Sequence, residues 1–161
     1  MLQPDLELAR ELGPVLSQNF GEHYLGSRED RGEITHWVDA RVWRQAAEFL
    51  KYQTEFQVLE DLMVVDYLDR EPRFDLAIVC LSLEHRCCVR LKTLVAEDQP
   101  VDSISSVLVG ASWYEREMWD LFGVHFNEHP DLRRLLLPAD YQGFPLRKDY
   151  PVTGPATSAY R

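Results

Sequence analysis

Apolar residues recur with the spacing of an α-helix in two stretches of the first third of the chain. The first stretch follows Asp5, which can cap a helix, and contains Gly13-Pro14, which we expect to end or kink it. The second follows Asp39, another capping residue. The apolar positions are Leu8, Leu12, Val15 and Leu16 in the first stretch, and Val42, Trp43, Ala46, Ala47 and Leu50 in the second.

Other stretches have the composition of β-strands. A hairpin is predicted where Phe74–Leu83 and Cys88–Ala96 flank the turn Glu84-His85-Arg86. The first arm is apolar on both faces, as in a central strand, whereas the second alternates apolar residues with Arg90 and Lys92. Shorter strands are expected at His23–Gly26, Ile34–Val38 and Leu62–Leu68, with a charged turn at Ser27–Gly32 between the first two.

A helix of about three turns is predicted between Ser112 and Gly123. Ser112 and Glu115 have the spacing of a capping box, in which each side chain bonds to the backbone near the other. Gly123 stands where a left-handed residue ends a helix. Arg116 and Asp120 are four positions apart and can form an ion pair.

Glu117 falls at the margin of the apolar side of this helix. A carboxylate in that position is costly unless a basic group meets it.

The spacing is also helical just before this segment, from Ser103 through Ile104, Val107 and Leu108. The element order is therefore αββαβββαα. It favours an α+β fold, a two-layer sandwich with one mixed or antiparallel sheet and helices on one face. We divide the chain into an α+β domain, residues 1–123, and an extended, proline-rich C-terminal docking tail, residues 124–161.

The tail has no convincing helix or strand outside Leu132–Leu137. Its large apolar side chains are too many to stay in water, so they must pack against this domain or another polypeptide. Arginine tolerates partial burial and offers a planar fork to carboxylates, so basic residues beside apolar ones suit a protein interface. The basic residues are Arg133, Arg134, Arg147 and Lys148, and the apolar ones are Phe126, Leu132, Leu135, Leu136, Leu137, Tyr141, Phe144, Leu146 and Tyr150.

Charge and composition exclude several classes of partner. The net charge of −10 and the pI near 4.9 argue against nucleic acid and against an anionic membrane surface. No apolar run approaches the roughly 20 residues that cross a bilayer. The first residues lack the features of a signal or transit peptide, so we expect the chain to stay in the compartment where it is made.

The cysteines predict neither a disulfide framework nor a metal site. Cys80, Cys87 and Cys88 are odd in number, which favours a reducing compartment. Cys87 and Cys88 would point to opposite faces of a strand, so they cannot easily share one ion with His85. Small buried cysteines are the better interpretation.

An acid–base site is a weaker alternative. Glu117, Asp120 and His125 are residue types that transfer protons. A salt-bridged helix face followed by a solvated histidine explains the same residues without catalysis. No glycine-rich nucleotide-binding motif is present.

Three blocks of sequence resemble one protein family. They are Glu115–Gly123 (EREMWDLFG), His129–Arg134 (HPDLRR) and Gly143–Pro151 (GFPLRKDYP). In order and spacing they are similar to the C subunit, also called the 30 kDa subunit, of proton-translocating NADH:quinone oxidoreductase, respiratory complex I. The strand around Val65-Asp66-Tyr67 and the hairpin with its His85-Arg86 turn are similar as well.

The resemblance implies an accessory subunit of the hydrophilic arm that has no catalytic residues and no cofactor of its own. Iron–sulfur clusters, FMN, NADH and quinone would belong to neighbouring subunits. The partners implied are the D subunit of complex I, which forms the quinone site, with the B and I subunits nearby, on the cytoplasmic side of the bacterial inner membrane. The positions carried over as interfacial or structural signature residues are Glu115, Arg116, Glu117, Asp120, Gly123, Pro130, Asp131, Arg133, Arg134, Pro145, Leu146, Arg147, Lys148, Asp149 and Pro151.

Two other functions fit the same sequence. One is the equivalent subunit of a related membrane-bound hydrogenase or formate hydrogenlyase, which gene neighbours would distinguish. The other is a stand-alone hydrolase or isomerase using Asp120 and His125, which would need a deep polar pocket around both side chains.

Overall fold

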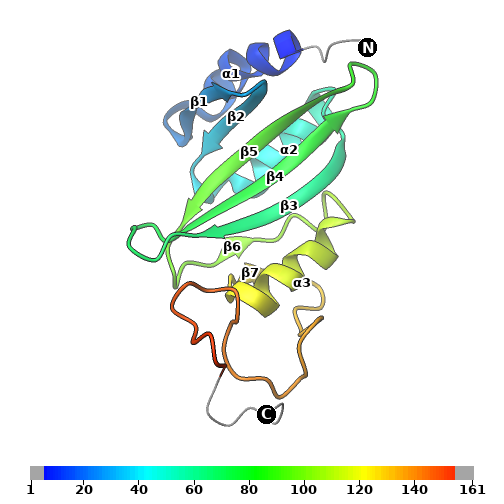
Figure 1. The fold of residues 1–161 in the computed structure, drawn as a ribbon. Helices are drawn as coiled ribbons and strands as arrows, with labels where there is room; N and C mark the ends of the chain where they lie inside the picture. Colours follow the sequence, from blue (N-terminus) through cyan, green and yellow to red (C-terminus); the bar gives the residue numbers. More distant parts are fainter. Residues whose placement is uncertain (1–5, 155–161) are drawn as a thin grey trace.

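The structure is a computed structural model that describes residues 6–154 (Figure 1). The expected capping residue Asp5 lies outside the described residues. The elements are α1 (Leu6–Phe20), η1 (Gly21–His23), β1 (Tyr24–Asp30), β2 (Glu33–Val38), η2 (Ala40–Val42), α2 (Trp43–Gln53), β3 (Val58–Asp66), β4 (Phe74–Ser82), β5 (Cys87–Val95), β6 (Val101–Asp102), α3 (Ala111–Phe122) and β7 (Phe126–Asn127).

Five strands form one mixed sheet in the order β1-β2-β5-β4-β3. Neighbouring strands are antiparallel except β2 and β5, which are parallel. The predicted β4–β5 hairpin is confirmed. Its first arm is the buried β4, an interior strand between β5 and β3, and its second arm alternates buried residues with the half-buried Arg90 and Lys92.

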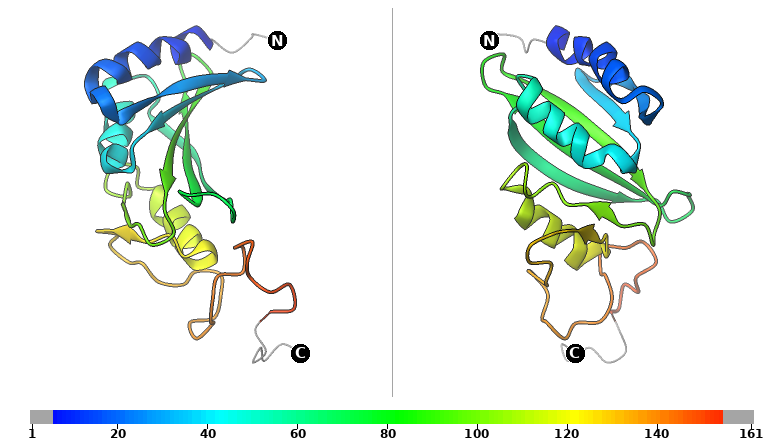
Figure 2. Two further views of the ribbon diagram at one scale, coloured as in Figure 1. Left: turned by 90° about the vertical axis from the view of Figure 1, so that its left-hand side faces the viewer. Right: turned by 180° about the vertical axis from the view of Figure 1, so that it is seen from behind.

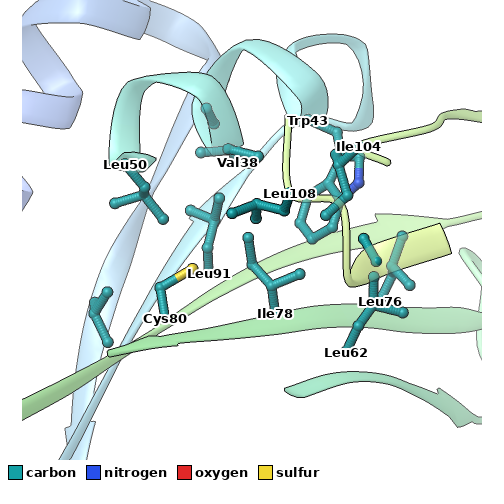
Figure 3. Packing of buried hydrophobic residues seen from close by; sticks show 14 of the residues in the cluster. Val38, Trp43, Leu50, Leu62, Leu76, Ile78, Cys80, Leu91, Ile104 and Leu108 are labelled. Atoms are coloured by element: carbon teal, nitrogen blue, oxygen red, sulfur yellow. The ribbon is translucent and has the colours of Figure 1, made fainter. Parts of the chain in front are cut away.

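The main core lies between this sheet and α2, as Figure 3 shows. Trp43 and Leu50 of α2 face Ile78 of β4 and Leu91 of β5, and all four side chains are almost completely buried. Helix α1 lies on the same face of the sheet, whereas α3 lies beside the edge strand β3 (Figures 1 and 2). The predicted α+β sandwich is confirmed.

Helix α1 does not end at Gly13-Pro14 but runs unbroken to Phe20. Pro14 is on the exposed side, where water can reach the backbone carbonyl that the proline leaves without an amide. Gly13 allows close packing, since a Cβ there would make a tight contact of 3.2 Å with the Tyr24 hydroxyl. That hydroxyl bonds to Nδ1 of His36, whose Nε2 lies 2.9 Å from the Ala9 carbonyl oxygen.

Two other predicted boundaries were wrong. Residues 104–110 form turns rather than a helix, so the two helices predicted at the end of the element order are one long helix, α3, which the short strand β7 follows. The spacing of Ile104, Val107 and Leu108 arises from a tight turn, in which the amides of Val107 and Leu108 both donate to the Ile104 carbonyl. The charged segment Ser27–Gly32 is mostly strand β1, and only Arg31-Gly32 turns.

Asp39 caps η2 rather than α2 directly, by accepting a bond from the Arg41 amide. Residues 124–154, called the strap from here on, contain only the two-residue β7, which pairs in parallel with β6. The segment Leu132–Leu137 is irregular. Figure 1 shows the strap looping around the C-terminal end of α3, at the end of the molecule away from α1.

Candidate protein-interaction site

Helix α3 begins without the predicted capping box. Gly110 precedes it, and no side chain caps its first turn. Glu115 is fully buried and turns instead to the loop after β6, where it accepts bonds from the Ser103 hydroxyl at 2.6 Å and the Ile104 amide at 2.7 Å. Burial raises the pKa of Glu115 to about 7, against these two hydrogen bonds, which lower it. The residue therefore joins the helix to the β6 loop.

His129 ties the beginning of the strap to the same cluster. Its fully buried ring lies 3.8 Å from Glu115 and donates through Nε2 to the Ser112 carbonyl oxygen at 3.0 Å. The Asp131 amide donates to Nδ1 at 3.0 Å, which requires the neutral ring with its proton on Nε2. The sequence placed His129 only within a motif and indicated no role for its side chain.

Asp120 holds the middle of the strap. One of its oxygens accepts from the Arg134 guanidinium at 2.7 Å, and the other accepts from the amides of Leu135, Leu136 and Leu137 at 3.0, 2.7 and 2.9 Å. Burial would raise the pKa of this carboxyl, but Arg134 and the amides together hold it below the ordinary value.

Arg134 also donates to the carbonyls of Tyr141 and Gly143, which closes the loop around Asp120. The predicted pair between Arg116 and Asp120 was therefore wrong. Arg116 donates to the carbonyls of Arg133 and Arg134 instead.

The end of α3 matches the prediction. Gly123 is left-handed, with φ of 76°, and its amide donates to the Trp119 carbonyl at 2.9 Å. The position also lacks space for a side chain. A Cβ there would lie 2.6 Å from the Phe144 ring and 2.7 Å from the Arg147 guanidinium, so the strap packs directly on the helix end.

A network around Arg73 holds the last part of the strap against the sheet. Arg73 forms a double ion pair with the buried Asp66 at 2.7 and 2.9 Å, and it also contacts Glu97 and Asp149. The Lys148 amide donates to Asp66 at 2.7 Å.

Arg147 belongs to the same network, since it donates to the Phe122 carbonyl and pairs with Glu97 at 2.6 Å. Arg73 and Glu97 were missed from the sequence. A signal existed, because β3 ends at Asp66 and its antiparallel neighbour β4 begins just after Arg73.

Several large apolar side chains on α3 and the strap remain exposed, among them Val152 near the end of the strap. Trp113 on α3 is 61% exposed, and Leu136 and Leu146 on the strap are 61% and 50% exposed. Within residues 6–154, the half-buried Glu117 has no ion pair or hydrogen bond through its carboxylate. Of the remaining signature positions, Pro145 is half-buried and Pro130, Asp131, Arg133, Lys148, Asp149 and Pro151 are exposed.

The structure does not assemble an acid–base site from Asp120 and His125. Asp120 is saturated by Arg134 and three amides, and its lowered pKa makes it a poor proton acceptor. His125 is exposed, just beyond the end of α3.

All three cysteines are free thiols. Cys87 is buried, whereas the half-buried Cys88 contacts Glu60 at 3.0 Å. Burial raises the pKa of Cys80 and of Cys88 to about 12. Among the described residues, no group of three or more His, Cys, Asp or Glu side chains is placed to hold a metal ion. In that part of the chain no helix has the length and hydropathy of a membrane span.

Comparison with known proteins identifies the family. The chain is 41% identical over 148 residues to the C subunit of the NADH-quinone oxidoreductase of Geobacter sulfurreducens, with 91% of each chain covered. It is 37% identical over 154 residues to the NADH-ubiquinone oxidoreductase subunit 9 of Reclinomonas americana, covering 94% of this chain and 76% of that one.

A solved structure shares the fold. It is a chain of the membrane-bound sulfane sulfur reductase, an archaeal respiratory membrane complex, with a TM-score of 0.75 at 19% identity, over 89% of this chain and 85% of that one. Residues 36–156 match the family described as "Respiratory-chain NADH dehydrogenase, 30 Kd subunit". The chain therefore belongs to the 30 kDa subunit family of the respiratory-chain NADH dehydrogenase, as its three sequence blocks predicted.

Proposed function

We propose that this protein is a cofactor-free, peripheral subunit of the hydrophilic arm of proton-translocating NADH:quinone oxidoreductase. It braces the D subunit, which forms the quinone site, and contacts the B and I subunits, which carry iron–sulfur clusters. Electron transfer through FMN, the clusters and quinone is the task of these neighbours. The subunit itself lies on the cytoplasmic side of the bacterial inner membrane, as a peripheral part of the membrane complex.

One observation carries the proposal: the strap satisfies most of its charges internally while large apolar side chains stay outside. Asp120 and Arg134 are matched to each other, and Arg147 and Asp149 are matched to the Arg73 network. By contrast, the fold leaves half or more of the surface of the Trp113, Leu136 and Leu146 side chains exposed. Exposed aromatic and aliphatic residues on a fixed backbone are the typical anchors of a protein interface.

The ion pairing of the buried carboxylates supports a structural rather than a catalytic role for this chain. The carboxylates of Asp66 and Asp120 are buried and bound by arginine. Their pKa values are lowered, with the arginine hydrogen bonds acting against burial, so at neutral pH both act as fixed anions. Fixed, paired charges suit a structural role.

The test is recovery of the complex from native membranes with tagged variants. Trp113→Ala and Leu136→Ala are each expected to lower the recovery of the quinone-site subunit about tenfold, because truncating an interface anchor typically costs more than 1 kcal/mol. Leu83→Ala is the matched control, since Leu83 is 70% exposed but lies at the turn after β4. Wild-type recovery with both strap-side variants would contradict the proposal.

Mass spectrometry of the recovered subunits also distinguishes the alternative complex. NADH:quinone oxidoreductase subunits are expected. Hydrogenase or formate hydrogenlyase subunits in their place would assign the chain to a related complex.

A further inference from the structure

A groove of about 790 Å³ separates α3 from the first half of the strap. Its walls include the apolar or aromatic residues Trp119, Leu132 and Tyr141. Three of its lining residues are arginines, Arg116, Arg133 and Arg134, and none is a carboxylate. We call it the arginine groove.

The charges around the arginine groove do not balance. Arg134 is neutralised by Asp120. Among the residues that the structure describes, Arg116 and Arg133 share a single carboxylate, Asp131, which lies 2.9 Å from Nε of Arg133 but 3.9 Å from Nη1 of Arg116. Within residues 6–154, three cations thus face two anions at the groove, on a chain whose net charge is −10. The local excess of positive charge is opposite to the charge of the whole molecule.

Among these arginines, Arg116 is the one whose charge is unfavourable to bury. Its side chain is only 10% exposed, and its two hydrogen bonds go to neutral backbone carbonyls, those of Arg133 and Arg134. A buried cation without a close anion is strongly unfavourable. The carbonyl bonds fix the plane of the guanidinium and leave Nη1 for another acceptor.

Arg133 is the accessible member. Its side chain is 73% exposed, and within residues 6–154 only its Nε is bonded, to Asp131. Its two terminal nitrogens therefore present a fork at the rim of the groove. Such a fork matches the two oxygens of a carboxylate.

We propose that the arginine groove receives an acidic side chain, Asp or Glu, from an extended segment of a partner subunit. The carboxylate supplies the missing negative charge to Arg116 and Arg133, and the apolar walls pack against the flanking residues of that segment. This inference rests on the proposed function and adds the chemistry of the partner to it.

Carbodiimide cross-linking of the assembled complex tests the idea. Arg133→Lys places a primary amine at the rim of the groove. A carboxyl group that touches the amine first adds to the carbodiimide and forms an O-acylisourea. The amine then attacks the acyl carbon and forms an amide bond, and the carbodiimide is released as a urea. Mass spectrometry then identifies the joined peptides.

The expected result is a link between position 133 and an Asp or Glu of a partner subunit, about tenfold more abundant than any partner link from the control Arg28→Lys. Arg28 is equally accessible, at 72% side-chain exposure, but lies on β1. Arg133→Glu should also lower subunit recovery, since it places like charges together.

Each outcome decides the matter. A variant that assembles but links only to Asp131 or to another carboxylate of its own chain overturns the inference and leaves the proposed function standing. The same holds if Arg133→Glu assembles as well as wild type. Failure of the wild-type chain to recover subunits of the complex overturns the proposed function, and the inference falls with it.

Discussion

At the scale of single residues, the strap depends on side chains that act as connectors between distant parts of the chain. Asp120 is the clearest case, because one carboxylate serves a guanidinium and three successive backbone amides. Among side chains, only an ionised carboxylate accepts four such hydrogen bonds without presenting a donor of its own. Its identity is therefore fixed by the backbone it serves.

Asp120→Asn is expected to lower the free energy of unfolding by about 3 to 5 kcal/mol, because the amide keeps the shape but leaves Arg134 with no buried counter-charge. Urea denaturation at neutral pH measures the change. Asp140→Asn, at an exposed strap position, is the control and should leave the free energy of unfolding within about 0.5 kcal/mol. An Asp120→Asn variant as stable as this control would show that the strap is held by other contacts.

At the scale of elements, the first turns of α3 are fixed by long-range partners rather than by a local cap, whereas Gly123 ends the helix locally. Ser112 and Glu115 satisfy the sequence rule for a capping box, yet Glu115 bonds to Ser103 and Ile104, and Ser112 contacts His129. The helix is thereby fixed to β6 on one side and to the strap on the other.

Glu115→Gln is expected to change how stability depends on pH. The folded pKa of Glu115, about 7, lies above the ordinary value of 4.5, so the folded state binds the proton more tightly than the unfolded state. The contribution of Glu115 to stability is therefore full below about pH 4.5 and is lost as the pH rises through 7. Glutamine does not titrate and removes this dependence.

Urea denaturation between pH 5 and 8 measures the effect. The free energy of unfolding of the wild type should fall relative to that of Glu115→Gln across this range. Parallel profiles for the two proteins would mean that the carboxyl group titrates normally.

The sequence predicted the elements well where periodicity decides them. The alternation in β5, the apolar run of β4 and the helical spacing in α2 all follow from burial on one or two faces. The prediction from sequence failed where a side chain can bond either to a residue nearby in the sequence or to a distant one. The local pairing of Arg116 with Asp120 is outcompeted, because Asp120 gains three amides and Arg134 from the strap, and no periodicity reports on that contact.

The candidate site, too, was predictable where local sequence marks it and not where distant contacts form it. The sequence blocks pointed to α3 and the strap, and the comparisons confirmed the family. Nothing local marks Arg73 as the centre of a network, since its partners Glu97 and Asp149 come from a distant loop and from the strap. Only the antiparallel register of β3 and β4 brings it beside Asp66.

At the scale of the whole molecule, the strap and the sheet form one connected body. The strap is fixed near its start by His129, in the middle by Asp120 and near its end by Asp149. The apolar residues of the tail, which the sequence expected to pack on this domain or on another polypeptide, are thus partly packed on their own domain. The fully buried Phe126 and the half-buried Leu132 both belong to or contact the common core.

Asp149→Ala is expected to release the end of the strap while leaving the sheet intact. Hydrogen exchange at the amides of Lys148 and Tyr150 should become faster, because the first donates to Asp66 within the Arg73 network and the second closes the adjacent turn. Exchange in β4 and β5 should be unchanged. Asp140→Ala is the control, and equal protection of Lys148 in both variants would exclude Asp149 as an anchor.

The triple attachment of the strap also determines when its conformational entropy is lost. We expect most of its backbone to become ordered as the chain folds, so that docking through the proposed interface should immobilise little beyond surface side chains such as Trp113 and Leu136. A partner subunit would then meet a preformed surface, and shape complementarity rather than coupled folding would govern how tightly the two associate.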